Sequence, residues 1–242
     1  MLSRLWQGQV WTPKSLGSAL LCWWRADAGV TLNGSTVSSW ADQSGNGKTL
    51  SQALAARQPT YDATGLNGFP CITFDGVDDV LQTAAHLTEL DGVTGMVFAA
   101  AVQPTNRTAY WALAYMRNSS DGFILDSLAA SPSSGWRFAM PGGGGFGQAA
   151  SYGTSSLSPV VVAGQFASSR NYIYTDNVQR ASFATTGSTV VANTLPLYVG
   201  SRAPGTSPAP IKVREIVIAS TGLTTGNQLA QLNKYLAQRT GL

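Results

Sequence analysis

Few residues of this chain could carry acid–base or nucleophilic chemistry. The only glutamates are Glu89 and Glu215, and the only histidine is His86. A Ser-His-Asp triad would have to use His86, which lies in AAHLTELDG with no G-x-S-x-G elbow beside it. Cleaving a glycosidic bond needs two positioned carboxylates, which aspartates could supply but which no motif of this kind marks. We therefore expect a protein that is not an enzyme.

Two groups of acidic residues could bind a cation through oxygen ligands. One begins at Asp42 in DQSGNGK, and the other is Asp75, Asp78 and Asp79 in FDGVDD. A calcium loop starting at Asp42 would require a bidentate glutamate at its twelfth position, which is Ala53. We therefore interpret both groups as turns whose side chains bond nearby backbone, with calcium at Asp42, Asp75, Asp78 and Asp79 as the alternative. No other cofactor is expected.

Aromatic side chains are the better candidates for binding a ligand. Each offers a flat apolar face with a polar rim, which suits stacking on a sugar ring. Packing inside the core is the alternative for every one of them. The candidates in or beside strand-like runs are Trp111, Tyr115, Trp136, Tyr172 and Tyr174. Trp6 and Trp11 lie in the first residues of the chain, where we expect an arm over 1–12 that anchors the protein to a neighbour.

Composition argues against several classes of partner. Only 11% of the 242 residues are charged, and the net charge is +3. The basic residues are scattered along the chain rather than gathered in a stripe, so we expect no nucleic-acid partner. No run approaches the roughly 20 apolar residues of a membrane span. Cys22 and Cys71 both lie in apolar runs, and we expect them to be buried and unbonded.

Short β-rich runs separated by turn residues dominate the sequence and predict an all-β fold. The predicted strands are 19–26, 70–75, 95–102, 109–117, 159–167, 171–176, 195–201 and 211–219. Strict alternation would place Trp111 and Tyr115 on one face of 109–117. It would likewise place Glu215 on one face of 211–219 with Ile211, Val213, Val217 and Ala219.

One helix and three long loops complete the expected organisation. Leu229, Leu232 and Leu236 recur at helical spacing, which predicts a helix over 225–239 that ends at Gly241. Long loops are predicted at 41–69, 141–158 and 202–210. Before Lys14 there is no apolar core of a signal peptide, so we expect the mature chain to begin at or near Met1.

The ends of the chain resemble a known family. The residues that carry the resemblance are Trp24, Ala26, Asp27, Trp40, Asp42, Ser44 to Gly47, Pro59 to Tyr61, Asn67, Gly68, Pro70 and Phe74 to Asp79, together with LYVGSR and KVREIVIAS near the C-terminus. They resemble the laminin-G-like, concanavalin A-like domains of phage virion and bacterial surface proteins. The resemblance implies a two-sheet antiparallel jelly-roll sandwich over 13–242, closed by a short C-terminal helix.

The resemblance also implies a function. It points to a non-catalytic, lectin-like protein of a phage particle that binds host glycans, packs on other virion proteins, or does both. The alternatives are a purely structural capsid decoration or tail protein, a bacterial cell-surface or extracellular location, and a polysaccharide-degrading enzyme. The glycosidase branch of the family carries E-x-D-x-x-E, but Glu89 and Asp91 are followed by Thr94 here. The protein could form homo-oligomers.

Overall fold

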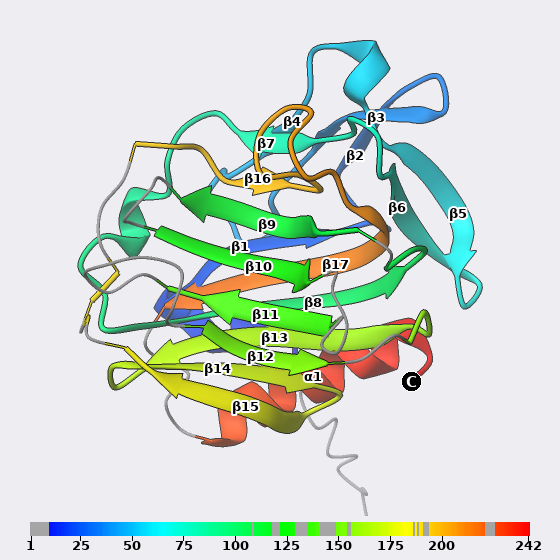
Figure 1. The fold of residues 1–242 in the computed structure, drawn as a ribbon. Coiled ribbons are helices and arrows are strands. Elements are labelled where there is room, and N and C mark those ends of the chain that lie inside the picture. The colour runs from blue at the N-terminus through cyan, green and yellow to red at the C-terminus, as the bar shows by residue number, and fades with distance from the viewer. Residues whose placement is uncertain are drawn as a thin grey trace, which may run out of the picture.

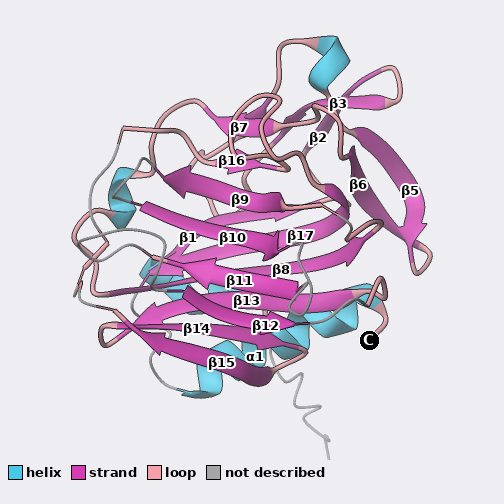
Figure 2. Cartoon of the chain, viewed as in Figure 1, coloured by secondary structure: helices cyan, strands magenta, loops and turns pink. Residues whose placement is uncertain are grey.

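A computed structural model describes most of the chain. The described residues are 10–107, 109–117, 122–128, 135–140, 149–153, 156–185, 187, 189–190, 194–220 and 226–242. Over these residues the regular structure is mostly strands, with one α-helix, α1 (Gly226–Thr240), and short 3₁₀ turns (Figure 2). The 3₁₀ turns are η1 (Pro13–Ala19), η2 (Ala55–Arg57) and η3 (Thr88–Leu90).

One half of the sheet is centred on two long strands, β8 and β17. Hydrogen-bonded neighbours follow in the order β15 (Val178–Ala184), β14 (Arg170–Thr175), β13 (Val160–Ala167), β8 (Gly95–Pro104), β17 (Pro210–Ser220) and β1 (Leu20–Arg25). The first and last predicted strands therefore lie side by side as β1 and β17. The start of β17 also pairs with β6 (Phe69–Asp75), which continues to β5 (Thr60–Leu66).

The other half lies across the core from the first (Figure 1). Its strands follow in the order β7 (Leu81–Thr83), β16 (Tyr198–Val199), β9 (Trp111–Arg117), β10 (Gly122–Leu128), β11 (Gly135–Ala139) and β12 (Ala149–Gly153). Short strands β2 (Val30–Asn33), β3 (Thr36–Trp40) and β4 (Leu50–Ser51) join the halves.

The expectation of two separate sheets in a jelly-roll sandwich needs correction. Strand β3 pairs with β4 and also with β5, and β4 pairs with β7, so the ladder runs without a break from one half to the other. The described strands form one 17-stranded antiparallel sheet. Its terminal strands β12 and β15 lie close together, so the sheet is nearly closed, like a barrel. The all-β class and the single C-terminal helix are confirmed.

The core has two compartments that share β8 and β17. Alternate residues of β8 face opposite sides: Phe98 packs inside the closed sheet, whereas Val97, Ala99 and Ala101 face outwards. α1 covers that outer side through its buried leucines, Leu229, Leu232 and Leu236, as the helical spacing predicts. The alanines let the helix approach closely, and almost every residue of β8 is therefore buried.

Two β-bulges overturn the predicted alternation. On β17 the register with β8 shifts between Val213 and Glu215, and on β9 the register with β10 shifts at Leu113. An extra residue at a bulge sends all later side chains to the opposite face. Ile211 and Val213 thus face the interior but Val217 and Ala219 face α1, and Tyr115 leaves the face that carries Trp111.

The predicted strands all occur, but the long loops were only partly right. β4, η2 and β5 lie within 41–69, and β12 lies within 141–158. The sequence did not predict these strands because they are short or polar and give a weak strand signal. Cys22 and Cys71 are buried and free, as expected. Trp11 packs its ring edge-on against Tyr235 of α1, with centroids 5.9 Å apart. Trp6 lies outside the described residues, so the arm over 1–12 stays a prediction.

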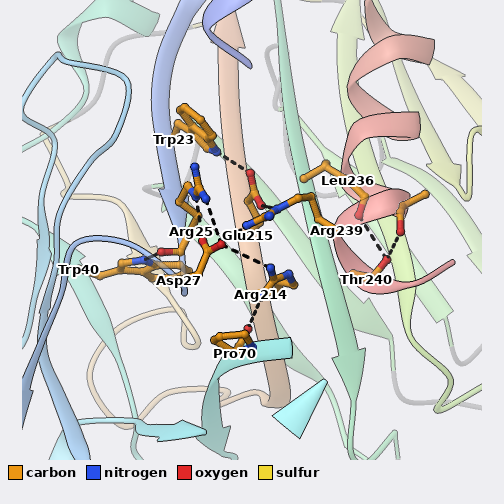
Figure 3. A network of polar contacts seen from close by, with 11 residues as sticks. Trp23, Arg25, Asp27, Trp40, Pro70, Arg214, Glu215, Leu236, Arg239 and Thr240 are labelled. Carbon is orange, nitrogen blue, oxygen red and sulfur yellow. Dashed lines mark hydrogen bonds and ion pairs between the residues drawn. The ribbon is translucent and has the colours of Figure 1, made fainter. Parts of the chain in front are cut away.

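A network of charges around the buried Glu215 ties β1, β17 and α1 together (Figure 3). Glu215 is fully buried; the Trp23 indole N–H donates to its Oε1 at 2.6 Å and Arg239 Nε donates to its Oε2 at 3.2 Å. Arg239 also bonds Asp27, which accepts from Arg25 at 2.8 Å. Burial raises the pKa of Asp27, but the bonds from Arg25 and Arg239 outweigh it and hold that pKa well below its usual range.

Replacing Glu215 tests this network. Glu215→Gln keeps the side chain's size but leaves Arg239 short of a buried counter-charge, so the free energy of unfolding should fall by about 3 kcal/mol. Urea unfolding followed by circular dichroism measures this. The matched control is Glu89→Gln, which removes the other glutamate from its ion pair with Lys48, where Glu89 is 42% exposed. Its cost should stay below about 1 kcal/mol. Equal losses in the two variants would mean that the Glu215 network does not clamp the fold.

Candidate functional site

The outer face of β9, β10 and β11 carries a buried carboxylate with two bonded partners. Asp126 of β10 is fully buried, and Arg137 lies directly opposite it on β11. Arg137 binds both carboxylate oxygens, through Nε at 2.9 Å and through Nη2. The Tyr110 hydroxyl donates to Asp126 Oδ2 at 2.6 Å. Asp126 therefore holds the arginine and the tyrosine in place and has little capacity left for a ligand.

Arg202 and Tyr115 extend this cluster. The Arg202 guanidinium lies over the rings of Tyr110 and Tyr115, 5.7 Å and 5.2 Å from their centroids. Both rings and Arg202 are half-buried. Burial, followed by the charge of Asp126, raises the pKa of Tyr110 well above its usual value, so its hydroxyl stays protonated. We call Tyr110, Tyr115, Asp126, Arg137 and Arg202 the tyrosine–arginine cluster.

The cluster offers the contacts that a hydroxyl-rich ligand needs. Tyrosine rings give apolar surface, and guanidinium groups give several fixed donors to ligand oxygens. The sequence analysis found only Tyr115. It missed Tyr110, Asp126, Arg137 and Arg202 because they come from separate segments that strand pairing brings together. The polar residues inside the apolar runs of β10 and β11 were the available signal.

The other predicted aromatic residues lie in different places. Trp111 and Trp136 are fully buried and meet edge-on in the interior, with centroids 5.4 Å apart. Tyr172 and Tyr174 are neighbours on β14, with ring centroids 6.3 Å apart, and Tyr174 packs beside the core under α1. The structure thus brings Trp111 together with Trp136, and Tyr172 with Tyr174, but places Tyr115 with neither pair.

The two acidic groups are not one site. Asp42 caps its own turn and β1, accepting from the backbone N–H of Trp23 at 2.9 Å and of Ser44 at 2.8 Å. Carboxylate oxygens of Asp75, Asp78 and Asp79 lie within 4.8 Å of one another. Burial, with the nearby charges of Asp75 and Asp78, raises the pKa of Asp79 to about 6. Calcium binding by these residues stays a prediction.

Comparison with known proteins shows structural likeness only. No family model and no curated protein matches the chain. A Trypanosoma rangeli sialidase matches 95% of this chain and 33% of its own, with a TM-score of 0.57 and 17% identity. An arabinofuranosidase complexed with arabinofuranosyl-alpha-1,2-xylobiose matches 85% of this chain and 51% of its own, with a TM-score of 0.60 and 13% identity. The chain therefore spans about a third to a half of these two enzymes.

A third neighbour corresponds to the present chain over nearly its whole length. It is domain 4 of AbnA, a GH43 extracellular arabinanase from Geobacillus stearothermophilus, in complex with arabinotriose. The match covers 88% of this chain and 98% of that one, with a TM-score of 0.60 and 11% identity. These likenesses show the β-fold that such glycan-acting proteins share; they do not single out the concanavalin A-like family.

The neighbours correct the expected function. A non-catalytic virion or surface protein was expected, but the solved structures reported above are glycoside-cleaving enzymes or a domain of one. None of them supports phage particles or virion partners. No helix in the described ranges is long and apolar enough to cross a membrane. The predicted location and the absence of a nucleic-acid partner stay predictions.

Asp79→Asn should stabilise the protein in a pH-dependent way. The folded-state pKa near 6 lies above the usual value, so ionising Asp79 opposes folding, and its stabilising contribution is lost as the pH rises through 6. Asparagine cannot ionise and can still accept the Asp75 N–H bond, which is 2.9 Å long. Thermal unfolding at pH 8 should show a gain of about 1–2 kcal/mol that disappears at pH 4.

The matched control is Asp62→Asn, a β5 aspartate outside this group that accepts from the Thr64 N–H. A gain of equal size at pH 4 and pH 8 would contradict the raised pKa of Asp79. Adding calcium provides a second reading: if the three aspartates bind it, calcium should raise the unfolding temperature of the wild type but not of Asp79→Asn.

Proposed function

We propose that this chain acts in glycan processing as a domain that holds the glycan, and that the tyrosine–arginine cluster is the binding surface. The observation that carries the proposal is Arg202 lying across two half-buried tyrosine rings beside the Asp126–Arg137 pair. Aromatic surface next to fixed donors matches the alternation of apolar ring faces and hydroxyl groups on a sugar. The likeness to the arabinanase domain in complex with arabinotriose supports the choice of ligand class.

Preorganisation of the cluster favours binding. Asp126 fixes both Arg137 and the Tyr110 hydroxyl, so these groups lose little further freedom when a ligand arrives. Arg202 is held between two rings in the same way. Arginine is suited to this position because its planar guanidinium can stack on a ring and still donate from its edge.

Calorimetric titration with arabinotriose tests the proposal. Tyr115→Ala and Arg202→Gln should each weaken binding about tenfold, which is about 1.4 kcal/mol, because each removes one side of the stacked platform. Tyr172→Ala is the matched control, since it removes a half-buried strand tyrosine from the other candidate pair. The control should bind as the wild type does. If Tyr172→Ala alone weakens binding, the glycan is held on β14 instead, and the cluster is not the site.

Hydrolysis by the chain itself is the second candidate function. One observation favours it: a buried carboxyl of raised pKa, Asp79, lies close to Asp75 and Asp78. A carboxyl of raised pKa beside a second carboxyl group is the pairing that glycosidases use as general acid and second carboxylate.

Release of reducing sugar from arabino-oligosaccharides measures that activity. On this second candidate, Asp79→Asn should lower the rate at least about a hundredfold while leaving the affinity for arabinotriose unchanged, because loss of a general acid affects the chemical step. Asp62→Asn serves again as the control. Activity that is unchanged in Asp79→Asn would remove this carboxyl from the mechanism, and no release by the wild type would leave binding as the function.

A further inference from the structure

A small pocket opens where the ends of β11 and β12 approach β13, β14 and β15. It has a volume of about 150 Å³, which suits one small chemical group rather than an extended ligand. Its lining is mostly polar and includes two arginines, Arg107 and Arg180, which come from segments far apart in the sequence. The pocket shares no residue with the tyrosine–arginine cluster.

Arg107 is a buried cation that forms no ion pair with a carboxylate of the described residues. Arg107 is only 8% exposed. Arg107 Nε donates to the Ser156 carbonyl at 2.9 Å and Nη1 donates to Ser127 Oγ at 3.2 Å. The guanidinium lies 4.7 Å from the centroid of the Trp136 ring. Burial lowers its pKa to about 10.

Burying a charge is unfavourable unless an opposite charge compensates it. Neutral acceptors and an aromatic face compensate for the buried charge only in part. In the pocket lining, the two arginines outnumber the one carboxylate, Asp176. Two half-buried arginines, Arg239 and Arg137, each contact a carboxylate instead. The absence of such a partner at Arg107, among the residues that the structure describes, therefore points to a ligand.

The rest of the lining is also rich in donors. Arg180 is exposed at the mouth, with its guanidinium 4.9 Å from the Tyr152 centroid and its Nε donating to Thr175 Oγ1 at 2.6 Å. The indole N–H of Trp136, which is fully buried, has no acceptor within the described part of the chain. Asp176 also lines the pocket, but its Oδ1 accepts the Val161 N–H at 3.0 Å and so is directed to the backbone.

We propose that this pocket binds an oxyanion, namely the carboxylate that an acidic sugar carries. Two arginines can donate to carboxylate oxygens in pairs, and the half-buried ring of Tyr152 can border the sugar. The inference rests on the proposed glycan-holding function and adds a subsite for one charged sugar unit. It assigns to Arg107 the role of primary anion ligand and to Arg180 the role of a second donor at the entrance.

Titration of the full chain with glucuronic acid, and separately with glucose, tests the subsite. The wild type should bind glucuronic acid and should bind glucose at least tenfold more weakly, because glucose lacks the carboxylate. Arg180→Gln should weaken binding of glucuronic acid about tenfold, and since Arg180 is exposed this variant should fold normally. Arg107→Lys keeps the charge but loses the planar fork, and should weaken binding by at least as much.

Arg170→Gln is the matched control. Arg170 lies on the same β14–β15 hairpin and donates to a serine hydroxyl, Ser182 Oγ at 3.1 Å, but it does not line the pocket. This variant should bind glucuronic acid as tightly as the wild type. Equal weakening in Arg170→Gln and Arg180→Gln would show general charge attraction and overturn the subsite.

Acetate, sulfate and inorganic phosphate distinguish the source of the oxyanion. Competition by acetate with glucuronic acid supports a carboxylate site. Binding of sulfate or phosphate without any binding of glucuronic acid overturns the acidic-sugar assignment, as does the absence of binding by every anion.

Titration of arabinotriose into the same variants separates the subsite from the proposed function. If arabinotriose still binds Arg107→Lys but glucuronic acid does not bind the wild type, only the subsite is rejected. Loss of arabinotriose binding in Tyr115→Ala, with glucuronic acid still bound, reports on the tyrosine–arginine cluster separately.

Discussion

The fold depends on the pairing of charges around the buried Glu215. Glu215 is fully buried on the outer face of β17, where the strand lies between β1 and α1. An ionised carboxylate in that position is tolerated only because Trp23 and Arg239 bond it. Arg239 reaches on to Asp27, just beyond β1, and so the first strand, the last strand and the helix must all be in place together. Asp27 and Asp42 are among the N-terminal residues that carry the family resemblance, and in this structure both form bonds that stabilise the fold.

The bulges decide how the sheet uses its residues. β17 and β8 are apolar on both faces because the closed sheet lies on one side and α1 on the other. The bulge at Arg214 turns Glu215 out of the apolar interior and towards its partners. The bulge at Leu113 turns Tyr115 out of the interior and towards Arg202. In each strand one extra residue separates an apolar segment that packs in the interior from a segment that carries polar side chains. The Glu215 network and the tyrosine–arginine cluster therefore both depend on a β-bulge.

Charge handling also separates structural sites from candidate binding sites. The buried carboxylates Glu215 and Asp126 each have an arginine partner, Arg239 and Arg137 respectively. At Arg107 the contacts within the described part of the chain are neutral acceptors and aromatic rings. A glycan-processing protein has a use for both kinds of surface: the fixed tyrosines and arginines suit neutral hydroxyl groups, and the basic pocket suits a charged sugar unit.

The sequence by itself determined the all-β class, the position of each strongly apolar strand and the C-terminal helix. These follow from local periodicity and turn residues, which act over a few neighbouring positions. It did not determine the closure of the sheet, because β3 bonds to both β4 and β5 only once three short, weakly marked strands meet in space. Nor did it determine which aromatic residues are accessible: Trp111 and Trp136 looked like Tyr115 in the sequence, but they are buried. Only the tertiary structure decided this, since a single-residue bulge reverses a strand's faces, and since Asp126, Arg137 and Arg202 become neighbours only through long-range pairing.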